Sequence, residues 1–135
     1  MTNTDTVATA APKHYAEITA FFGGNERTFR LDYKRVVEWE ENTGFSLMAS
    51  LTAMVKAQSG VQSPLRELIR LALIGGGLTP SAANIDLQRN FDPYPPAECF
   101  FLALTIAEAA LYGSDEYRAA RDAKAVLEGA VTDGE

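Results

Sequence analysis

Residues 68–85 read LIRLALIGGGLTPSAANI and place three consecutive glycines between an apolar run and a Thr-Pro step. A phosphate loop of the P-loop type needs Lys and then Ser or Thr after its glycines, between a strand and a helix. Here Leu78 follows the glycines, and the residues before them have helical spacing. We therefore predict a structural turn between two helices. The first residue after the preceding helix is expected to be a glycine of positive φ. The following helix is expected to have a threonine N-cap and a proline at its first position. The predicted turn comprises Gly75, Gly76, Gly77, Thr79 and Pro80.

The segments on either side of this turn have the spacing of amphipathic helices. The helix before it is expected to begin with Ser63 as N-cap and Pro64 at the first position. Its last turn is apolar on all sides, so we expect that end to be buried. The predicted core stripes are Leu65, Leu68, Ile69 and Ala72 before the turn, and Ala83, Leu87 and Phe91 after it.

Residues 15–31 predict a β-hairpin, because apolar and polar side chains alternate on both sides of a Gly-Gly-Asn turn. A lone hairpin is marginally stable in water, so its apolar face must pack on helices or on another chain. That face consists of Ile18, Phe22, Phe29 and Leu31. The preceding residues, 1–13, have no periodicity and are predicted to form a disordered arm.

Two further helices are predicted between the hairpin and the glycine turn. The first begins after Asp32 and ends at Gly44, a residue suited to a left-handed cap. The second begins after Ser46 and ends at Gly60, and its expected apolar stripe is Leu47, Leu51, Met54 and Val55. The expected apolar stripe of the first helix is Tyr33, Val36, Val37 and, unusually, Glu40.

Glu40 is a possible buried polar anchor, because a carboxylate on an apolar face is costly unless it is hydrogen-bonded or paired. Three arrangements are open. The carboxylate accepts backbone N–H groups of a neighbouring helix start or loop, it pairs with Arg66 or Arg70, or it reaches water at the edge of the stripe. Trp39 lies about 60° from the stripe centre, a position typical of the core periphery and also of interaction hot spots.

Residues 97–112 predict the most hydrophobic helix, with apolar side chains on two sides. Its main stripe is expected to contain Phe100, Phe101 and Leu104, and its opposite side carries Leu102 and Ile106. A helix of this kind is central or meets another subunit. The candidate partner-binding residues are therefore Trp39, Leu102 and Ile106.

Together these elements predict an α+β fold that is mostly α, in which an N-terminal β-hairpin packs on a small bundle of four or five short helices. The domain is expected to span residues 14–113. Residues 114–135 have helix-forming composition but a thin apolar stripe, and predict a loosely packed C-terminal helix with a frayed tail.

Composition and single residues argue against several functions. The net charge is -6, so a nucleic-acid partner is not expected. Residues 97–112 contain two glutamates and are shorter than the ~20 apolar residues of a membrane span. Cys99 is the one cysteine and His14 the one histidine, and neither has a catalytic or metal-binding partner in its sequence pattern. We predict no enzyme activity, no metal and no cofactor.

The order of these parts resembles the small tail assembly chaperone family of phages and gene transfer agents, whose members are also called gene transfer agent tail or tail tube proteins. The resemblance covers about residues 15–113. It is carried by the hairpin strand FRL (29–31), the helix end WEENTG (39–44), the helix start SLMASL (46–51) and the turn LIRLALIGGG (68–77).

The resemblance implies a non-enzymatic protein of the bacterial host cytoplasm that binds the tape measure protein during tail morphogenesis, with the tail tube protein as a further candidate partner. The alternative is a structural tail component, such as a tube or terminator-like subunit of a phage-like particle. A small enzyme or ligand-binding domain ranks last, because no pocket chemistry is visible in the sequence. A homo-oligomer stays open, and neither a membrane nor a nucleic acid is expected as a partner.

Overall fold

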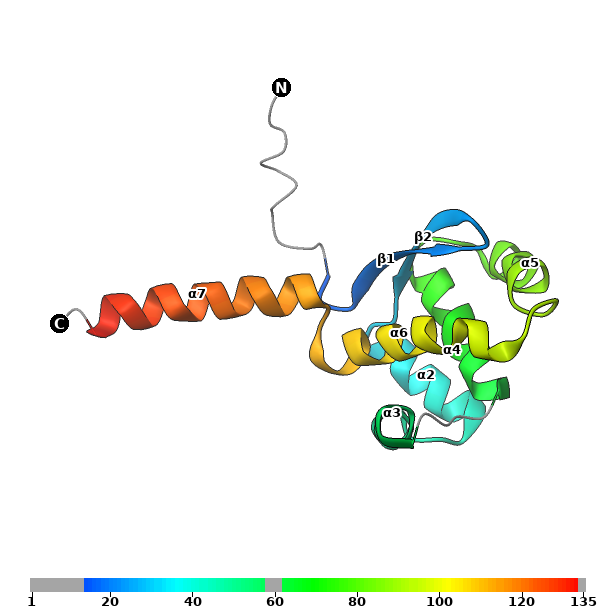
Figure 1. The fold of residues 1–135 in the computed structure, drawn as a ribbon, viewed down its shortest axis with the longest axis horizontal. Coiled ribbons are helices and arrows are strands. Elements are labelled where there is room, and N and C mark those ends of the chain that lie inside the picture. Colours follow the sequence, from blue (N-terminus) through cyan, green and yellow to red (C-terminus); the bar gives the residue numbers. More distant parts are fainter. Residues whose placement is uncertain (1–13, 58–61, 134–135) are drawn as a thin grey trace, which may run out of the picture.

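The computed structural model describes residues 14–57 and 62–133. A β-hairpin lies on a group of helices, and the last helix projects from this body as an arm (Figure 1), which confirms the predicted fold class. The predicted arm (1–13), the expected helix end at Gly60 and the last two residues lie outside the described residues. The elements are β1 (Glu17–Phe22), β2 (Asn25–Arg30), α2 (Tyr33–Thr43), α3 (Leu47–Ala57), α4 (Gln62–Gly75), α5 (Pro80–Asn90), the 3₁₀ turn η1 (Pro96–Cys99), α6 (Phe100–Tyr112) and α7 (Asp115–Asp133).

The hairpin forms as the alternation predicts, with β1 and β2 antiparallel and Ile18 opposite Phe29. Its two-residue turn is Gly23-Gly24, with φ of 66° and 84°. Positive φ at both turn positions matches the twist of the strands, and glycine adopts it without strain. Phe22 and Phe29 are buried and meet edge to face, so the apolar side of the hairpin faces the helices.

The C-terminus of α4 lies directly against the backbone of β2. A Cβ atom on Gly75 would stand 1.9 Å from the carbonyl oxygen of Arg30, and one on Gly76 would stand 2.0 Å from that of Thr28. No side chain fits within these distances. The first two glycines of the triplet are therefore required by the close approach of helix and strand.

The third glycine makes the turn. Gly77 has φ of 125°, whereas Gly76 still donates its N–H to Ala72 O (2.9 Å) as a helical residue does. The expected glycine of positive φ is therefore confirmed, but it is Gly77, the second residue after α4, and not the first. Gly76 still follows the helical hydrogen-bonding pattern. Thr79 accepts a hydrogen bond from Ala82 N (3.1 Å) and Pro80 begins α5, as predicted.

Helix α4 is the centre of the core. All the residues of its predicted stripe are buried, and so are Leu71 and Leu73 in the last turn, whereas Ile74 is only partly buried, so the expected all-round burial is confirmed in part. The helix begins at Gln62, so Ser63 lies inside it and the prediction of Ser63 as N-cap is wrong. On α5, the predicted residues Ala83, Leu87 and Phe91 are buried.

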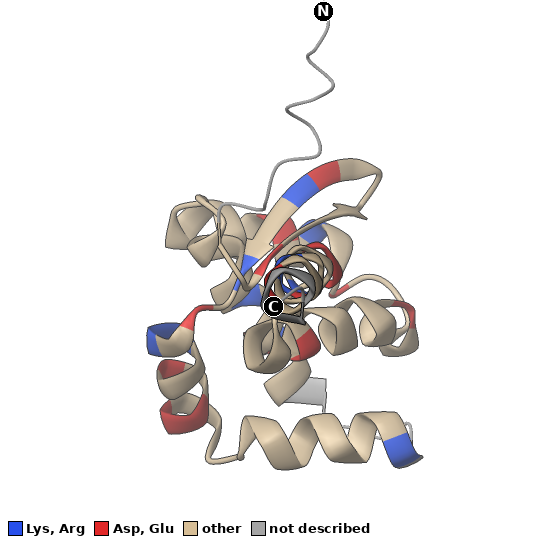
Figure 2. Cartoon of the chain, turned by 90° about the vertical axis from the view of Figure 1, so that its left-hand side faces the viewer, with Lys and Arg blue, Asp and Glu red and all other residues tan. Residues whose placement is uncertain are grey.

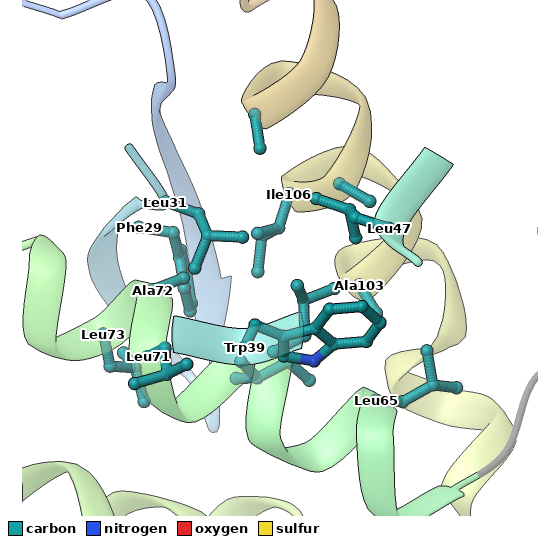
Figure 3. Packing of buried hydrophobic residues seen from close by; sticks show 14 of the residues in the cluster. Phe29, Leu31, Trp39, Leu47, Leu65, Leu71, Ala72, Leu73, Ala103 and Ile106 are labelled. Carbon is teal, nitrogen blue, oxygen red and sulfur yellow. The ribbon is translucent and has the colours of Figure 1, made fainter. Parts of the chain in front are cut away.

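The buried side of α2 differs from the predicted stripe. Val36 and Trp39 are buried, whereas Tyr33 is 75% exposed. The helix is rotated toward Trp39 because the indole N–H donates to Pro64 O (2.8 Å) at the start of α4, which satisfies the polar atom of the ring. Figure 3 shows the Trp39 ring inside the hydrophobic cluster, so the prediction of a peripheral position is wrong.

The main stripe predicted for α6 is wrong in part. Phe101 is 66% exposed, whereas Phe100 and Leu104 are partly buried against the core. The buried residues are Ala103, Ile106, Ala107, Ala109 and Ala110. Small side chains let α6 approach α4 closely, and Phe101 is left on the outside. A hydrophobicity count cannot detect this arrangement, because it ranks phenylalanine above alanine for burial.

An ion pair that the sequence pattern did not indicate ties the hairpin to α5. Arg27 Nε donates to Asp86 Oδ2 (2.8 Å), and Asn90 Nδ2 donates to Asp86 Oδ1 (2.8 Å). Asp86 is buried, and its hydrogen bond raises the pKa of Arg27 above its usual value. The hairpin tip is thereby fixed on α5 by partners 59 residues apart in the chain.

Helix α7 leaves the body at Gly113, where φ is 94°. Residues 96–129 contain a window apolar enough to cross a membrane by length and composition, with a mean hydropathy of 1.3. Gly113 interrupts this segment between two helices, and the buried alanines of α6 belong to the core. The window is 39% buried in the structure, so the buried alanines of α6 account for part of its apolar character.

We expect Gly76→Ala to lower the free energy of unfolding by about 1–3 kcal/mol, since a methyl group cannot fit against Thr28 O without moving helix or strand. Gly129→Ala in α7 is the control, because nothing lies within 4 Å of its Cβ position. Urea unfolding followed by Trp39 fluorescence measures both. Equal stabilities of the two variants would contradict the close approach.

Candidate functional site

An open apolar groove of about 340 Å³ lies between the end of α2, helix α3 and the start of α4. We call it the α3 groove. None of its lining residues is charged, and the polar side chains among them are two serines. The residues are Trp39, Phe45, Ser46, Leu47, Ala49, Ser50, Ala53, Met54, Pro64, Leu65 and Leu68.

Glu40 fixes the N-terminus of α3. Its Oε2 accepts the backbone N–H of Leu47 (2.8 Å), the first residue of α3, and Ser46 Oγ accepts that of Ala49 (3.2 Å). Gly44, with φ of 78°, turns the chain between the two helices. The carboxylate also lies at the positive end of the α3 dipole, where negative charge is favourable. Glu40 is half-buried, in the first of the three arrangements that its sequence position left open.

The two arginines considered for Glu40 have other partners. Arg66 forms two hydrogen bonds with Asp92 (2.8 and 2.9 Å). Arg70 forms two with Glu67 (2.8 and 2.7 Å), and its hydrogen bonds hold the pKa of Glu67 below its usual value. Asn42 of α2 also donates to Glu67 (3.0 Å). Of these contacts, the Asn42–Glu67 hydrogen bond links α2 to α4.

Helix α3 and the residues before it carry exposed apolar side chains. Phe45, which lines the groove, is 44% exposed. Met48 (50% exposed) and Val55 (58%) lie on α3 outside the groove lining, and the hydroxyl of Tyr112 lies 3.4 Å from Met48 Sδ. Lys56 is the one charged residue of α3, which is the nearly uncoloured horizontal helix at the bottom of Figure 2. Exposed apolar side chains gathered on one element are typical of a binding surface.

The three candidate partner-binding residues lie in different places. Trp39 lines the α3 groove but is only 1% exposed. Leu102 is half-buried and lines a hollow between β1, α6 and the start of α7. Ile106 is 1% exposed and belongs to the core. The structure thus does not bring the three together in one site, and their role in binding stays a prediction.

Sequence reasoning missed the residues that make the groove, especially Ala49 and Ala53 on α3. A signal was present, since α3 is a short apolar helix with charge only at its end. The predicted stripe residues Leu47, Leu51 and Met54 are buried as expected, but Val55 is exposed. The pattern could show the buried side of α3, but not that its neighbours leave the other side uncovered.

The residues usually associated with catalysis are not arranged for it. His14 Nδ1 accepts Ala16 N–H (3.0 Å), and burial, together with Arg30, lowers the pKa of the imidazole. Burial and the nearby Glu98 raise the pKa of Cys99, so its thiol stays protonated at neutral pH. Within residues 14–57 and 62–133, no group of three or more His, Cys, Asp or Glu could hold a metal ion.

The comparison with known families agrees with this picture. A family model described as phage tail tube protein, GTA-gp10, matches residues 15–113. The chain belongs to this family. It is a tail family of phages and gene transfer agents, and the match covers the hairpin and helices α2 to α6 but not α7. No curated protein and no solved structure matches the chain.

We expect Glu40→Ala to lower the stability of the protein by about 1–2 kcal/mol, because the first N–H of α3 loses its acceptor. Glu40→Gln keeps an oxygen acceptor and is expected to lose less. Glu41→Ala, at an exposed position on the same helix, is the control. Thermal unfolding measures all three variants, and unchanged midpoints for both Glu40 variants would refute the anchoring role.

Proposed function

We propose that this tail protein is a non-enzymatic tail assembly chaperone that holds an apolar helical segment of the tape measure protein in the α3 groove. The observation that carries the proposal is the groove itself, which is open, lined by uncharged side chains and includes the exposed Phe45. A groove of this kind accepts an amphipathic helix through apolar residues spaced at i, i+3 or i+4, and i+7.

The chemistry of α3 suits a partner whose sequence varies along its length. Met54 of α3 lines the groove, and Met48, which is 50% exposed, lies on the same helix outside the lining. The flexible, polarisable methionine side chain adapts to different apolar shapes. A chaperone for a long apolar helical protein needs such adaptability, because it must cover several segments until the tube polymerises. We propose that this takes place in the cytoplasm of the bacterial host.

A structural role in the tail is the second candidate, favoured by the family description as a tail tube protein. In that case the α3 groove would be filled by a neighbouring tail subunit in the finished particle. The two candidates make opposite predictions for purified particles. A tube subunit is present in stoichiometric amounts, and a chaperone is absent.

Co-expression with the tape measure protein tests the first candidate. We expect the chain to raise the soluble yield of the tape measure protein and to form a complex with it on a sizing column. Ala53→Glu, which places a charge in the groove, is expected to abolish both effects. Thr52→Glu is the matched control on the exposed part of the same helix, outside the groove lining.

Three outcomes oppose the chaperone function. One is an unchanged yield of soluble tape measure protein, and another is equal loss of binding in both variants. The third is recovery of the chain in stoichiometric amounts from purified particles, which would support the structural role instead. Circular dichroism of both variants establishes that a loss of binding does not come from unfolding.

A further inference from the structure

The outer edge of strand β1 is open. Among the described residues the sheet consists of β1 and β2, so β1 is paired on one side only. In an antiparallel hairpin with a two-residue turn, the pair next to the turn is hydrogen-bonded inward, and every second residue from there points its N–H and C=O outward. Phe22 is paired with Asn25 next to the turn, so the outward groups of β1 belong to Glu17, Thr19 and Phe21.

The position of α4 agrees with this alternation. Thr28 is paired with Thr19, and its carbonyl oxygen faces Gly76 at the outer edge of β2. Helix α4 therefore covers the edge of β2. On the other edge, no residue that the structure describes hydrogen-bonds to the outward groups of Thr19 or Phe21. An open edge of this kind is a template for a further strand.

The open edge forms one wall of a hollow of about 500 Å³. Residues Ile18 to Phe21 of β1 line this wall, which is about 13 Å long at about 3.3 Å per residue. The opposite wall is one face of α6 from Phe101 to Ala109, which rises about 12 Å. Because the two walls are equal in length, an extended segment between them can bond to β1 and contact α6 at the same time.

The chain reaches the base of this hollow directly before β1. Ser114 N donates to Tyr15 O (2.7 Å), and Ser114 lines the hollow. Glu17 N donates to His14 O (3.1 Å), a hydrogen bond from the fourth to the first residue of a β-turn. Such a turn reverses the direction of the chain. The segment that precedes His14 is therefore connected to β1 as the first strand of a hairpin would be.

We propose that residues 7–11 of the same chain, Val-Ala-Thr-Ala-Ala, form a third strand that lies antiparallel to β1 in this hollow. In the proposed register Ala10 lies opposite Thr19, and Ala8 lies opposite Phe21. Each of these two alanines then offers its N–H and C=O to the open backbone groups of its partner.

The composition of the segment suits this position. Valine and threonine favour extended backbone, and the side chains of residues 7–11 are uncharged and small enough to lie between a strand and a helix. In the proposed register Val7, Thr9 and Ala11 share the side of the sheet that faces the helices. Pro12, which has no N–H, lies opposite Glu17, whose own N–H is already bonded within the turn.

The charges at the base of the hollow also fit this occupant. The charged residues that line it are Glu108, Asp115, Glu116 and Arg118. Arg118 is ion-paired with Asp115 and Glu108, and three carboxylates against one guanidinium leave this end acidic. Lys13 is the one charged residue in residues 7–13 and directly precedes the turn that is anchored here. The proposed strand thus brings its positive charge to the acidic end.

The third strand would protect the hairpin from pairing with other chains, because it satisfies the edge that they would otherwise extend. It limits the disorder predicted for residues 1–13 to those before Val7. The inference depends neither on the α3 groove nor on the proposed chaperone function.

Amide hydrogen exchange of the full chain, followed residue by residue by NMR, tests the proposal. We expect the N–H groups of Thr19 and Phe21 to exchange slowly. Ala10→Pro removes the N–H that bonds to Thr19 O, and is expected to accelerate both exchange rates by more than about tenfold. Thr9→Pro is the matched control, because the N–H of residue 9 points away from β1 in the proposed register, and both rates should stay nearly unchanged.

Three outcomes would overturn the proposal. One is fast exchange of both amides in the unaltered chain, which would leave the edge open. Another is equal acceleration by the two proline variants. The third is protection that rises with protein concentration, which would assign the edge to a second copy. The amide of Phe29, which is paired with Ile18 inside the hairpin, establishes that each variant keeps β1 and β2 together.

Discussion

The contact between the end of α4 and the backbone of β2 determines the architecture of this protein. Gly75 and Gly76 bring the helix so close to the carbonyl oxygens of Arg30 and Thr28 that no side chain fits between them. This contact covers the apolar side of a hairpin that would be marginal alone. It also fixes the direction of α4, on which α2, α5 and α6 pack. The three glycines thus serve two purposes, close approach at the first two positions and a turn at the third.

Two hydrogen bonds position the helices that form the α3 groove. The indole of Trp39 links α2 to the start of α4, and the carboxylate of Glu40 links the end of α2 to the start of α3. Helix α3 is therefore held by its N-terminus at the edge of the body, where its buried side contributes Leu47, Leu51 and Met54 to the core. Its other side is not covered by the described residues and contributes Ala49, Ser50 and Ala53 to the α3 groove.

Much of this fold could be predicted from the sequence. The hairpin, the helix order, the caps at Asp32, Gly44, Ser46 and Thr79, and the core stripes of α4 and α5 depend on local chemistry, which a sequence pattern records directly. The rotation of α2 and α6 could not be predicted, because it depends on neighbours. Trp39 is buried since Pro64 O accepts its N–H, and the alanines of α6 are buried since α4 approaches closely. The groove was missed for the same reason, because a helix pattern does not show which side its neighbours leave open.

The docking of β2 on α4 has a consequence for the order of folding during synthesis. The hairpin leaves the ribosome early, but the glycines that cover it lie dozens of residues later in the chain. Bringing such distant segments together requires closing a long loop before the contact gives any stability. Until α4 has been synthesised, the hairpin therefore lacks the helix that covers it, and the nascent chain presents Phe22 and Phe29 to its surroundings.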